Sequence, residues 1–339
     1  MFLTIECSVI VTAYNRREFL VDALKSVIKQ TCARFRYEII LVKNFADDTI
    51  DAFCSSNGIK EIMMDGSIGE FYRKGIEESE GEIISFLDDD DIFTPDKLNE
   101  VIEAFRNNPE LGLYYNRSIM CDRDQFNSKI SGVLENNRSS IPDTVYTMKK
   151  DGLRFLMKNG WDGNNSSMSI KRDIVLNEIR NLVPIYENED FFLYALTALS
   201  GFDILVGPKI LTIRGRGNYN KTRIEGLSGT YFCERAADQL EHSIQTYSVL
   251  ESMEERYRNV GNNEIFLVVE SRLERLRMEE DIVNSRKTSL DKIFMIIKTG
   301  YRVFGVKYII GTAYIYVVGL IHRIRLINRC QALKLIFTL

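Results

Sequence analysis

The stretch Glu82-Ile-Ile-Ser-Phe-Leu-Asp-Asp-Asp-Asp-Ile-Phe-Thr-Pro-Asp-Lys-Leu98 decides the fold. Its apolar run, Ile83 to Leu87, predicts a buried strand. A helix is expected to follow at once, with Thr94 as its N-cap and Pro95 in its first position. The four aspartates 88–91 therefore stand at the carboxyl end of a strand, where open α/β sheets bind their ligands.

Four adjacent carboxylates repel one another, and a plain turn rarely needs so many of them. Two interpretations are open, an acidic surface loop and a site for a divalent cation. Hard cations take carboxylate oxygens, and Mg²⁺ commonly combines one or two carboxylates with the phosphates of a substrate. The position between a buried strand and a helix favours the metal site.

Strands and helices alternate over the first 105 residues. The expected strands are residues 6–12, 37–42, 59–64 and 83–87. This alternation predicts a parallel sheet, with the loops 12–16, 43–47 and 88–91 along one edge. There is no GxGxxG after the first strand and no GxxxxGK[ST] anywhere. Dinucleotide oxidoreductases and P-loop NTPases are therefore poorly supported.

Composition narrows the class of protein. The chain has 339 residues, 45% hydrophobic and 27% charged, which is typical of a folded protein with two or more units. The net charge of −4 argues against nucleic acid as a partner. Residues 286–339 carry ten Lys or Arg and one Asp, a charge of +9, so the remainder is −13. A basic tail on an acidic body indicates contact with an anionic surface.

The cysteines and histidines give no pattern typical of a bridge or a metal site. The six cysteines are Cys7, Cys32, Cys54, Cys121, Cys233 and Cys330, without a CxxC, so reduced and mostly buried thiols in a cytosolic protein are expected. The two histidines are isolated, which argues against a His-based zinc site. The first expected strand begins so near residue 1 that no signal peptide is predicted.

Three segments resemble the family 2 glycosyltransferases of the GT-A fold. They are Ser8–Arg16, Gly69–Ile76 and Gly81–Leu98, and their order and spacing agree over roughly the first 110 residues. The resemblance implies an α/β fold, a GT-A-type mostly parallel sheet flanked by helices, here with a C-terminal helical extension. It also implies an Asp-x-Asp that binds Mg²⁺ or Mn²⁺ and the diphosphate and ribose of a nucleotide-sugar donor. Asp88 and Asp90 match that motif as metal ligands, with Asp89 between them.

The same resemblance places further donor contacts in two other segments: Thr12, Ala13, Tyr14, Asn15 and Arg16 after the first strand, and Arg73. Arg73 is equally compatible with a surface position on a helix. The chain departs from the family after its second strand, where the usual acidic pair that contacts the base is Lys43 and Asn44. Asn44 can still donate and accept hydrogen bonds, whereas Lys43 cannot accept one. Asp47 or Asp48 is the alternative.

The second half of the predicted catalytic domain, residues 109–228, is expected to bind the acceptor. Residues 119–144 are predicted to be loop-rich, and 148–158 to be a helix. Trp161 and Asn165 lie in a polar segment and are candidate acceptor contacts, with Trp161 either stacking on a sugar or packing under a loop. A strand pair is expected at 205–213. Arg214 and Arg216 in the glycine-containing loop that follows suit a diphosphate, or form a basic turn.

Glu189 and Asp190 stand at the start of an apolar helix. Acids at this position complement the helix dipole without any catalytic role. The resemblance implies a general base here, and Asp190 matches it, with Glu189 as the alternative. A base that takes the acceptor proton opposite the leaving group implies an inverting reaction.

The C-terminal part is expected to be helical: a hairpin over 229–288 and a basic, hydrophobic tail over 289–339. Residues 303–321 contain one charge and only just reach the length of a membrane span. An interfacial or re-entrant hairpin on anionic lipids is favoured over a full span. A soluble helix buried in an oligomer is the third possibility.

These observations predict an inverting, metal-dependent glycosyltransferase attached to the cytoplasmic face of a membrane, in which residues 1–108 bind the nucleotide sugar. The acceptor would be lipid-linked or a growing glycan, as in polysaccharide biosynthesis, and a homo-oligomer remains possible. The alternatives are a sugar-nucleotide pyrophosphorylase-like enzyme, which would want a glycine-rich phosphate loop, and a non-catalytic scaffold or membrane-assembly protein.

Overall fold

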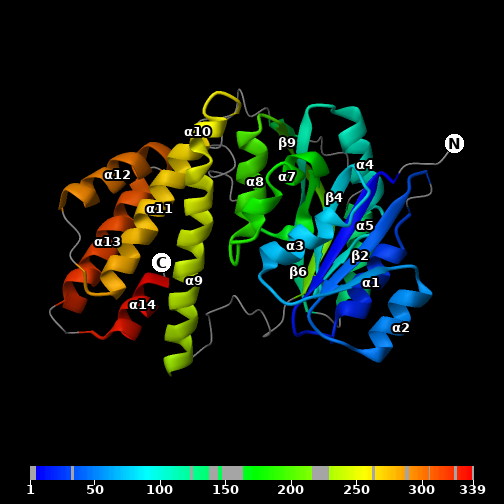
Figure 1. Ribbon diagram of the computed structural model, residues 1–339, viewed down its shortest axis with the longest axis horizontal. Coiled ribbons are helices and arrows are strands. Elements are labelled where there is room, and N and C mark those ends of the chain that lie inside the picture. Colours follow the sequence, from blue (N-terminus) through cyan, green and yellow to red (C-terminus); the bar gives the residue numbers. More distant parts are fainter. Residues whose placement is uncertain are drawn as a thin grey trace. The chain divides into compact units, whose positions relative to one another are not determined.

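A computed structural model describes residues 5–31, 34–122, 125–136, 144–146, 163–215, 229–261, 264–286, 290–304, 306–323 and 327–337 (Figure 1). These residues form two compact units. The first holds the described residues up to 215 except 186–188, and the second holds 186–188 and the described residues from 229 onward.

The first unit opens with the predicted alternation of strands and helices. The elements are β1 (Cys7–Ala13), α1 (Leu20–Ile28), β2 (Tyr37–Lys43), α2 (Asp48–Ser56), β3 (Lys60–Met63), α3 (Ile68–Glu77) and β4 (Ile83–Asp88). The four strands are parallel and lie in the order β3-β2-β1-β4. Helix α3 begins with a capping box: the Ser67 hydroxyl accepts from the Glu70 N–H at 3.1 Å, and the Glu70 carboxylate accepts from the Ser67 N–H at 2.8 Å.

The sheet continues beyond β4 with mixed pairing. The remaining elements are β5 (Asp91–Phe93), α4 (Lys97–Asn107), β6 (Leu111–Cys121), α5 (Phe126–Asn136), β7 (Thr144–Tyr146), the 3₁₀ turn η2 (Asn165–Ser167), β8 (Met168–Lys171), α7 (Arg172–Leu176), the 3₁₀ turn η3 (Ile179–Leu182), α8 (Glu189–Leu199) and β9 (Asp203–Gly215). The order is β4-β8-β6-β9-β5, and β7 pairs with β9. The GT-A-type α/β fold is confirmed. The first half of the sheet is wholly parallel, and in the second half only β6 and β9 pair in parallel among the described strands.

Strand β8 runs antiparallel to both of its neighbours, β4 and β6. A strand that runs in the reverse direction begins at the edge where its neighbours end. The turn η2, which precedes β8, is therefore placed beside the carboxyl end of β4. This reversal brings residues 164–167 to the four aspartates, although about 75 residues separate them in the sequence.

Two local predictions around the aspartates were wrong. Residues 91–93 form a short strand, β5, because they pair with β9, and the N–H of Thr94 extends this pairing by donating to the carbonyl of Leu211 at 3.0 Å. The helix consequently starts later, at Lys97. Its N-cap is Asp96, whose side chain accepts from the Thr94 hydroxyl at 2.8 Å instead of capping the helix.

The segment predicted to be loop-rich is largely regular where it is described. Strand β6 extends to Cys121, α5 follows, and β7 pairs with β9. A small apolar cluster that includes Ile92, Phe126 and Ile213 stabilises this part. The strand pair expected at 205–213 is a single long strand, β9. The helix predicted at 148–158 lies outside the described residues.

The two faces of the parallel sheet are buried against different helices. Odd-numbered residues of β1, such as Val9 and Val11, belong to a core cluster with residues of α1, α2 and α4. The opposite face, which includes Ile10, lies against α3. Gly75 permits this close packing, because a Cβ there would lie 2.7 Å from the Ile10 Cγ2 atom. On the same face, the rings of Tyr72 and Phe86 are 4.4 Å apart.

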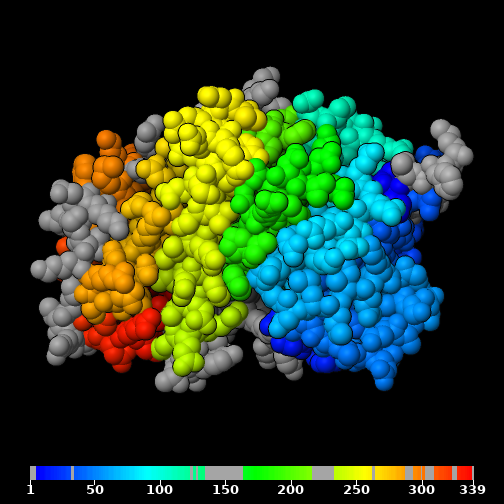
Figure 2. Space-filling model, in the orientation of Figure 1, coloured from blue at the N-terminus to red at the C-terminus, as the bar shows by residue number. Residues whose placement is uncertain are grey.

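The second unit is helical, with α9 (Gly229–Ser252), α10 (Glu254–Tyr257), α11 (Glu264–Val283), α12 (Leu290–Phe304), α13 (Val306–Arg323) and α14 (Arg329–Phe337). Helices α9 and α11 form the predicted hairpin and lie side by side (Figure 2). The tail helices α12 to α14 pack with them in the same unit. Gly319 lets α13 approach α11 closely, because a Cβ there would lie 2.7 Å from Ile282.

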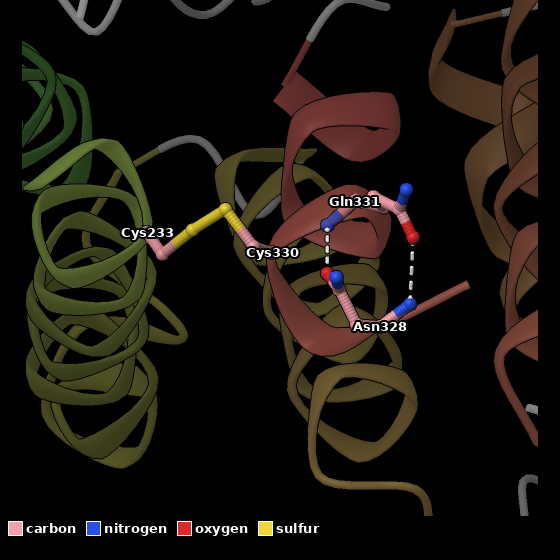
Figure 3. The surroundings of a disulfide bond; sticks show 4 residues. All are labelled: Cys233, Asn328, Cys330 and Gln331. Atoms are coloured by element: carbon pink, nitrogen blue, oxygen red, sulfur yellow. Dashed lines mark hydrogen bonds between the residues drawn. A yellow bond between two sulfur atoms is a disulfide. The ribbon is translucent and has the colours of Figure 1, made fainter. Parts of the chain in front are cut away.

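A disulfide between Cys233 of α9 and Cys330 of α14 corrects the expectation of reduced cysteines (Figure 3). The two Cα atoms are 5.1 Å apart, although the residues are separated by 97 positions in the sequence. Spacing along the chain cannot reveal such a pair, because only the fold brings it together. Cys330 is held in the first turn of α14, whose start is fixed by reciprocal 2.9 Å hydrogen bonds between Asn328 and Gln331. Cys7, Cys54 and Cys121 are free and buried, as expected.

Within the described parts of the chain, none of the helices combines the length and the apolar character that a membrane span requires.

Candidate active site

The predicted donor loops meet at the carboxyl edge of the parallel strands. Thr12 is in register with Asp88, and Ala13 with Lys43, so the chain leaves three neighbouring strands at one level. Thr12 and Ala13 are buried in β1, whereas the next residue, Tyr14, is 42% exposed.

Asn15 and Asn44 connect two of these loops. The Asn15 N–H donates to the Asn44 Oδ1 atom at 2.7 Å, and the Asn44 Nδ2 atom donates to the Asn15 Oδ1 atom at 3.1 Å. Asn15 adopts a positive φ of 55°, a conformation that asparagine tolerates better than most residues. Both amides therefore stand at the edge where the resemblance places the base of the donor.

Lys43 is directed away from this edge. Its ammonium group is fully buried and forms ion pairs with Asp51 and with Glu61, the latter at 3.2 Å. Burial lowers the pKa of Lys43, but the hydrogen bonds to the two carboxylates outweigh it and raise the pKa overall. The lysine that replaces an acidic residue of the family thus has a structural partner of its own.

Arg16 lies against the central pair of aspartates. Its Nε atom donates to Asp89 at 2.8 Å, and its Nη1 atom donates to Asp90 at 2.7 Å. Burial nevertheless dominates over this charge and raises the pKa of Asp89 to about 6. The other oxygen of Asp89, Oδ2, is buried and has no hydrogen-bond partner within the described structure.

Asp91 is a structural member of the acidic run. Its oxygens accept from the N–H of Gly215 at 3.1 Å and from the Nδ2 atom of Asn164 at 3.3 Å. Burial and the charge of Asp90 raise its pKa to about 6. Asp91 therefore joins the end of β9 and the segment before β8 to the end of β4.

A buried hydrogen-bond network around Ser166 holds the end of β4 in place. The Ser166 hydroxyl accepts from the Asp88 N–H at 3.0 Å, and the Ser166 carbonyl accepts from the Thr212 hydroxyl at 2.8 Å. The ammonium group of Lys97 also donates to that carbonyl and, at 3.1 Å, to Thr212. Burial holds the pKa of Lys97 well below its usual value. These contacts fix the backbone that carries Asp88.

Asp88 has a different environment from the three aspartates that follow it. Among the residues that the structure describes, its carboxylate has no hydrogen-bond or ion-pair partner. Burial, and then the charges of neighbouring carboxylates, among them Glu189, raise its pKa well above the usual value. A carboxylate in this situation is suited to bind a cation.

The donor set fits a divalent cation only in part. No group of three or more His, Cys, Asp or Glu side chains in the described ranges is arranged to hold a metal ion. Asp88 and Asp90 would supply two carboxylates, and the orphaned Oδ2 atom of Asp89 is a further buried acceptor. Two carboxylates and a diphosphate are a common set for Mg²⁺, so the residues fit a cation that arrives with its substrate.

The start of α8 lies on the other side of the acidic edge. Glu189 accepts a 2.7 Å hydrogen bond from the Nδ2 atom of Asn165, and Asp190, the next residue, is half-buried and accepts from the N–H of Phe191 at 2.6 Å. Asn165, a predicted acceptor contact, thus touches a predicted catalytic residue. Glu187 differs from this pair, because it faces Arg235 at 3.6 Å within the helical unit.

The structure differs in what it shows for the remaining predicted contacts, three arginines and one tryptophan. Arg73 pairs with Glu77 on its own helix at 2.7 Å. Arg214 is half-buried in β9, in register with Asp91. Trp161 and Arg216 lie outside the described residues.

Sequence reasoning missed Tyr72, Lys97, Asn164 and Ser166, which the structure brings to the acidic edge. Asn164 and Ser166 stand in the same polar run as Asn165, so the run itself was the available signal. Their partners could not be named, because the contact with Asp88 and Asp91 depends on the reversal of β8. Tyr72 and Lys97 occur within ordinary helical patterns and carry no local signal.

A parallel half-sheet that ends in carboxylates, continued by a mixed half-sheet, defines a GT-A-type fold. Solved structures of S. aureus TarS share this fold. The TarS 1–349 complex with UDP-GlcNAc aligns with a TM-score of 0.52 and 13% identity, over 93% of this chain and 92% of that chain. The complex with UDP aligns with a TM-score of 0.50 and 12% identity over the same shares.

Residues 8–174, just under half of the chain, match the family model "Glycosyl transferase family 2". Among curated proteins, an uncharacterized glycosyltransferase of Nostoc sp. is 29% identical over 125 residues, and one of Haemophilus influenzae is 32% identical over 111 residues. These matches cover 35% and 32% of this chain, and the chain spans only 38% and 37% of the length of the two relatives. The minor teichoic acid biosynthesis protein GgaB of Bacillus subtilis is 28% identical over 105 residues, which are 29% of this chain and 12% of GgaB.

Proposed function

We propose that the chain is a metal-dependent, inverting glycosyltransferase that moves a sugar from a nucleoside diphosphate to a hydroxyl of a lipid-linked or growing glycan. The observation that carries this proposal is the position of Asp88. Its carboxylate, without a partner among the described side chains, lies within electrostatic range of Glu189 at the start of α8. In this proposal, the carboxylate that binds the cation comes from the end of β4, and the carboxylate that accepts the proton comes from the start of α8.

The comparisons support the class of donor and of product. S. aureus TarS, which shares the fold, was solved with UDP-GlcNAc. GgaB of Bacillus subtilis, a relative of this chain, is a minor teichoic acid biosynthesis protein.

In the proposed reaction, Asp190 accepts the proton of the acceptor hydroxyl while the oxygen of that hydroxyl attacks the anomeric carbon. The bond between this carbon and the diphosphate oxygen breaks on the opposite side, which inverts the configuration. Glu189 stays bonded to Asn165 and keeps the start of α8 in place. Asp88 and Asp90 would hold Mg²⁺ or Mn²⁺, which supplies positive charge for the departing diphosphate. The Asn15–Asn44 pair would contact the base.

One substitution in the acidic run and one at the start of α8 test the metal site and the general base separately. Calorimetric titration with UDP, GDP, CDP, ADP and dTDP, each with MnCl₂, first identifies the nucleotide that the wild-type protein binds. Asp90→Asn should abolish the Mn²⁺-dependent part of that binding. Asp190→Asn should keep nucleotide binding and lower sugar transfer by about 10²- to 10⁴-fold, the usual contribution of a general base.

Two results would remove parts of the proposal. Unchanged Mn²⁺-dependent binding in Asp90→Asn would remove the metal assignment. Full transfer by Asp190→Asn would assign the base to Glu189 or to another group.

We also propose that the helical unit attaches the enzyme peripherally or re-entrantly to the cytoplasmic face of a membrane. Exposed apolar side chains recur along α13 at helical spacing: Ile310, Tyr314, Val317 and Leu320. On α12, Phe294 and Met295 are 68% and 58% exposed. An exposed apolar stripe in a region of net positive charge suits an anionic lipid surface.

Flotation with phosphatidylglycerol vesicles tests this attachment. The protein should float with these vesicles at low salt, and the double variant Ile310→Ser/Val317→Ser should float less. Vesicles of phosphatidylcholine are the control for charge. Wild-type protein that stays in the soluble fraction with both kinds of vesicle would contradict the attachment.

A further inference from the structure

Tyr72 of α3 is a buried tyrosine that the proposed reaction does not yet use. Its side chain is 1% exposed, and its hydroxyl has no hydrogen-bond partner within the described structure. Leaving a buried hydroxyl without a partner costs free energy in the folded protein, so such a group needs an explanation. The hydroxyl is a donor that a bound molecule can use.

The fold directs this hydroxyl toward the candidate active site. The Tyr72 ring packs 4.4 Å from the ring of Phe86. Alternate residues of a strand share one face, so Phe86 and Asp88 of β4 are on the same side of the sheet. The charges of Asp88, Glu189 and Asp190 all act on the phenol, and together with burial, the largest cause, they raise its pKa well above its usual value. The hydroxyl thus lies within electrostatic range of the carboxylates of β4 and α8.

Asn165 provides a second buried polar atom in the same region. Its side chain is 6% exposed, its Nδ2 atom donates to Glu189, and its Oδ1 atom has no hydrogen-bond partner in the described ranges. Glu189 is also one of the three carboxylates that act on Tyr72. Two separate elements, α3 and η2, therefore each place an unpartnered buried polar atom in the surroundings of Glu189.

The chemistry of the two atoms suits a sugar hydroxyl, because such a group both accepts and donates a hydrogen bond. A bare diphosphate oxygen only accepts, and it would gain nothing from Asn165 Oδ1. Tyr72 is also within electrostatic range of both Asp88, at the proposed diphosphate end, and Asp190, the proposed base. In the proposed reaction the transferred sugar has to occupy the space between these two ends.

We propose that Tyr72 and Asn165 recognise a hydroxyl of the sugar in the donor. The Tyr72 hydroxyl donates to the sugar oxygen, and the Asn165 Oδ1 atom accepts the proton of the same or an adjacent hydroxyl. This inference rests on the proposed function, and it assigns sugar specificity to two residues outside the acidic run.

Titration of Tyr72→Phe tests the inference. Phenylalanine keeps the packing against Phe86 and removes only the hydroxyl. The probes are a nucleoside diphosphate and its sugar-bearing form, such as UDP and UDP-GlcNAc or GDP and GDP-mannose, in MnCl₂. The pair is the one that the wild-type protein binds best. Tyr72→Phe should weaken binding of the sugar nucleotide about 5- to 10-fold and change binding of the bare diphosphate by less than twofold.

Tyr194→Phe is the matched control. Tyr194 is 2% exposed on α8, and its pKa is raised by burial, with no charged neighbour contributing. This control should leave the affinities for both probes unchanged. Thermal unfolding of both variants checks the fold, and Tyr72→Phe should unfold at the same temperature as the wild type or higher.

Three results would overturn the inference, and they are distinguishable from a failure of the proposed function. Equal weakening of both probes would show that Tyr72 acts through the structure of the site. Unchanged affinity for both probes would show that its hydroxyl contacts no sugar. A lower unfolding temperature with equal affinities would assign the hydroxyl to folding alone. A wild-type protein that binds none of the nucleotides would instead refute the proposed function, and this inference with it.

Discussion

Arg16 carries the positive charge that stabilises the acidic edge in the free protein. Its guanidinium group is 22% exposed and contacts Asp89 and Asp90, whose side chains are 4% and 8% exposed. Two carboxylates at this depth need a counter-charge, since burial of an unpaired charge is costly. A cation that binds Asp90 would compete with Arg16 for the same carboxylate.

Arg16→Ala should therefore destabilise the protein by about 2 kcal/mol in the absence of divalent cations, less than for a fully buried pair because the guanidinium group is partly exposed. Addition of MnCl₂ should restore more stability to the variant than to the wild type. Urea unfolding with and without MnCl₂ measures both effects.

Arg17→Ala is the matched control. Arg17 is 49% exposed and pairs with Asp47 at 3.5 Å. Its loss should cost less than about 0.5 kcal/mol, the value of a surface pair. Equal destabilisation in the two variants would contradict this account.

At the residue scale, the sequence was sufficient to locate the acidic run but not the partners of its members. The position of Asp88 to Asp91 follows from an apolar run that ends in charges. The hydrogen bonds that Asp91 accepts from Gly215 and Asn164 cannot be predicted in this way, because these groups lie 124 and 73 residues away in the chain. The departure at Lys43 was visible, whereas its burial against Asp51 and Glu61 required the fold.

At the scale of elements, the contact between α11 and α13 depends on small residues and on one buried ion pair. Glu279 of α11 is 7% exposed and lies 3.1 Å from the Nε atom of Arg275. Gly311 of α13 leaves room for this arginine, because a Cβ there would lie 3.3 Å from its guanidinium group. Gly311 and Gly319 of α13 thus both serve helix packing.

The pH dependence of stability should report on Glu279. Burial, the largest cause, raises its pKa above the ordinary 4.5, although Arg275 and Arg272 act in the opposite direction. Because the folded-state pKa is the higher one, the contribution of Glu279 to stability is fully present below pH 4.5 and is lost as the pH rises through the folded-state pKa. Relative to the wild type, Glu279→Gln should therefore be least stable near pH 4 and gain in relative stability at higher pH.

Thermal unfolding of both proteins between pH 4 and pH 8 measures this difference. Glu280→Gln, at the next position of the same helix, is the control and should give a difference that does not vary with pH in the same way. A constant difference between Glu279→Gln and the wild type would refute the raised pKa.

The same scale shows where prediction from the sequence ends. The four strands up to Leu87 were predicted to within one or two residues, since local apolar runs determine them. Strand β5, the length of β9 and the reversal of β8 were not predicted, because pairing between distant segments determines each of them. Residues 91–93 extend only because β9 lies beside them.

At the scale of the whole molecule, the chain combines the α/β unit that carries the acidic edge with a helical unit that a disulfide closes. The bridge joins α9 to α14 across 97 residues, so it constrains nearly the whole helical unit. In the chain-entropy model, closure of a loop of this length stabilises the folded state by roughly 4.7 kcal/mol, and measured values are commonly lower.

Cys233→Ser should lower the unfolding free energy of the helical unit by about 2 to 4 kcal/mol under non-reducing conditions. The wild-type protein in dithiothreitol should lose a similar amount, whereas dithiothreitol should not change the variant. Urea unfolding followed by circular dichroism, which reports the loss of helix, measures the three cases. A wild-type stability that is the same with and without reductant would contradict a role of the bridge.

The reversal of β8 also has a consequence for the order in which the protein is synthesised. The ribosome releases the four aspartates long before the turn that holds Asp88 and before the residues of α8. An N-terminal fragment that ends before residue 163 would contain all of the acidic run and none of the hydrogen bonds from Asn164 and Ser166. The acidic edge is therefore not encoded by one continuous segment: a truncated translation product would retain the four aspartates without the residues that hold them in place.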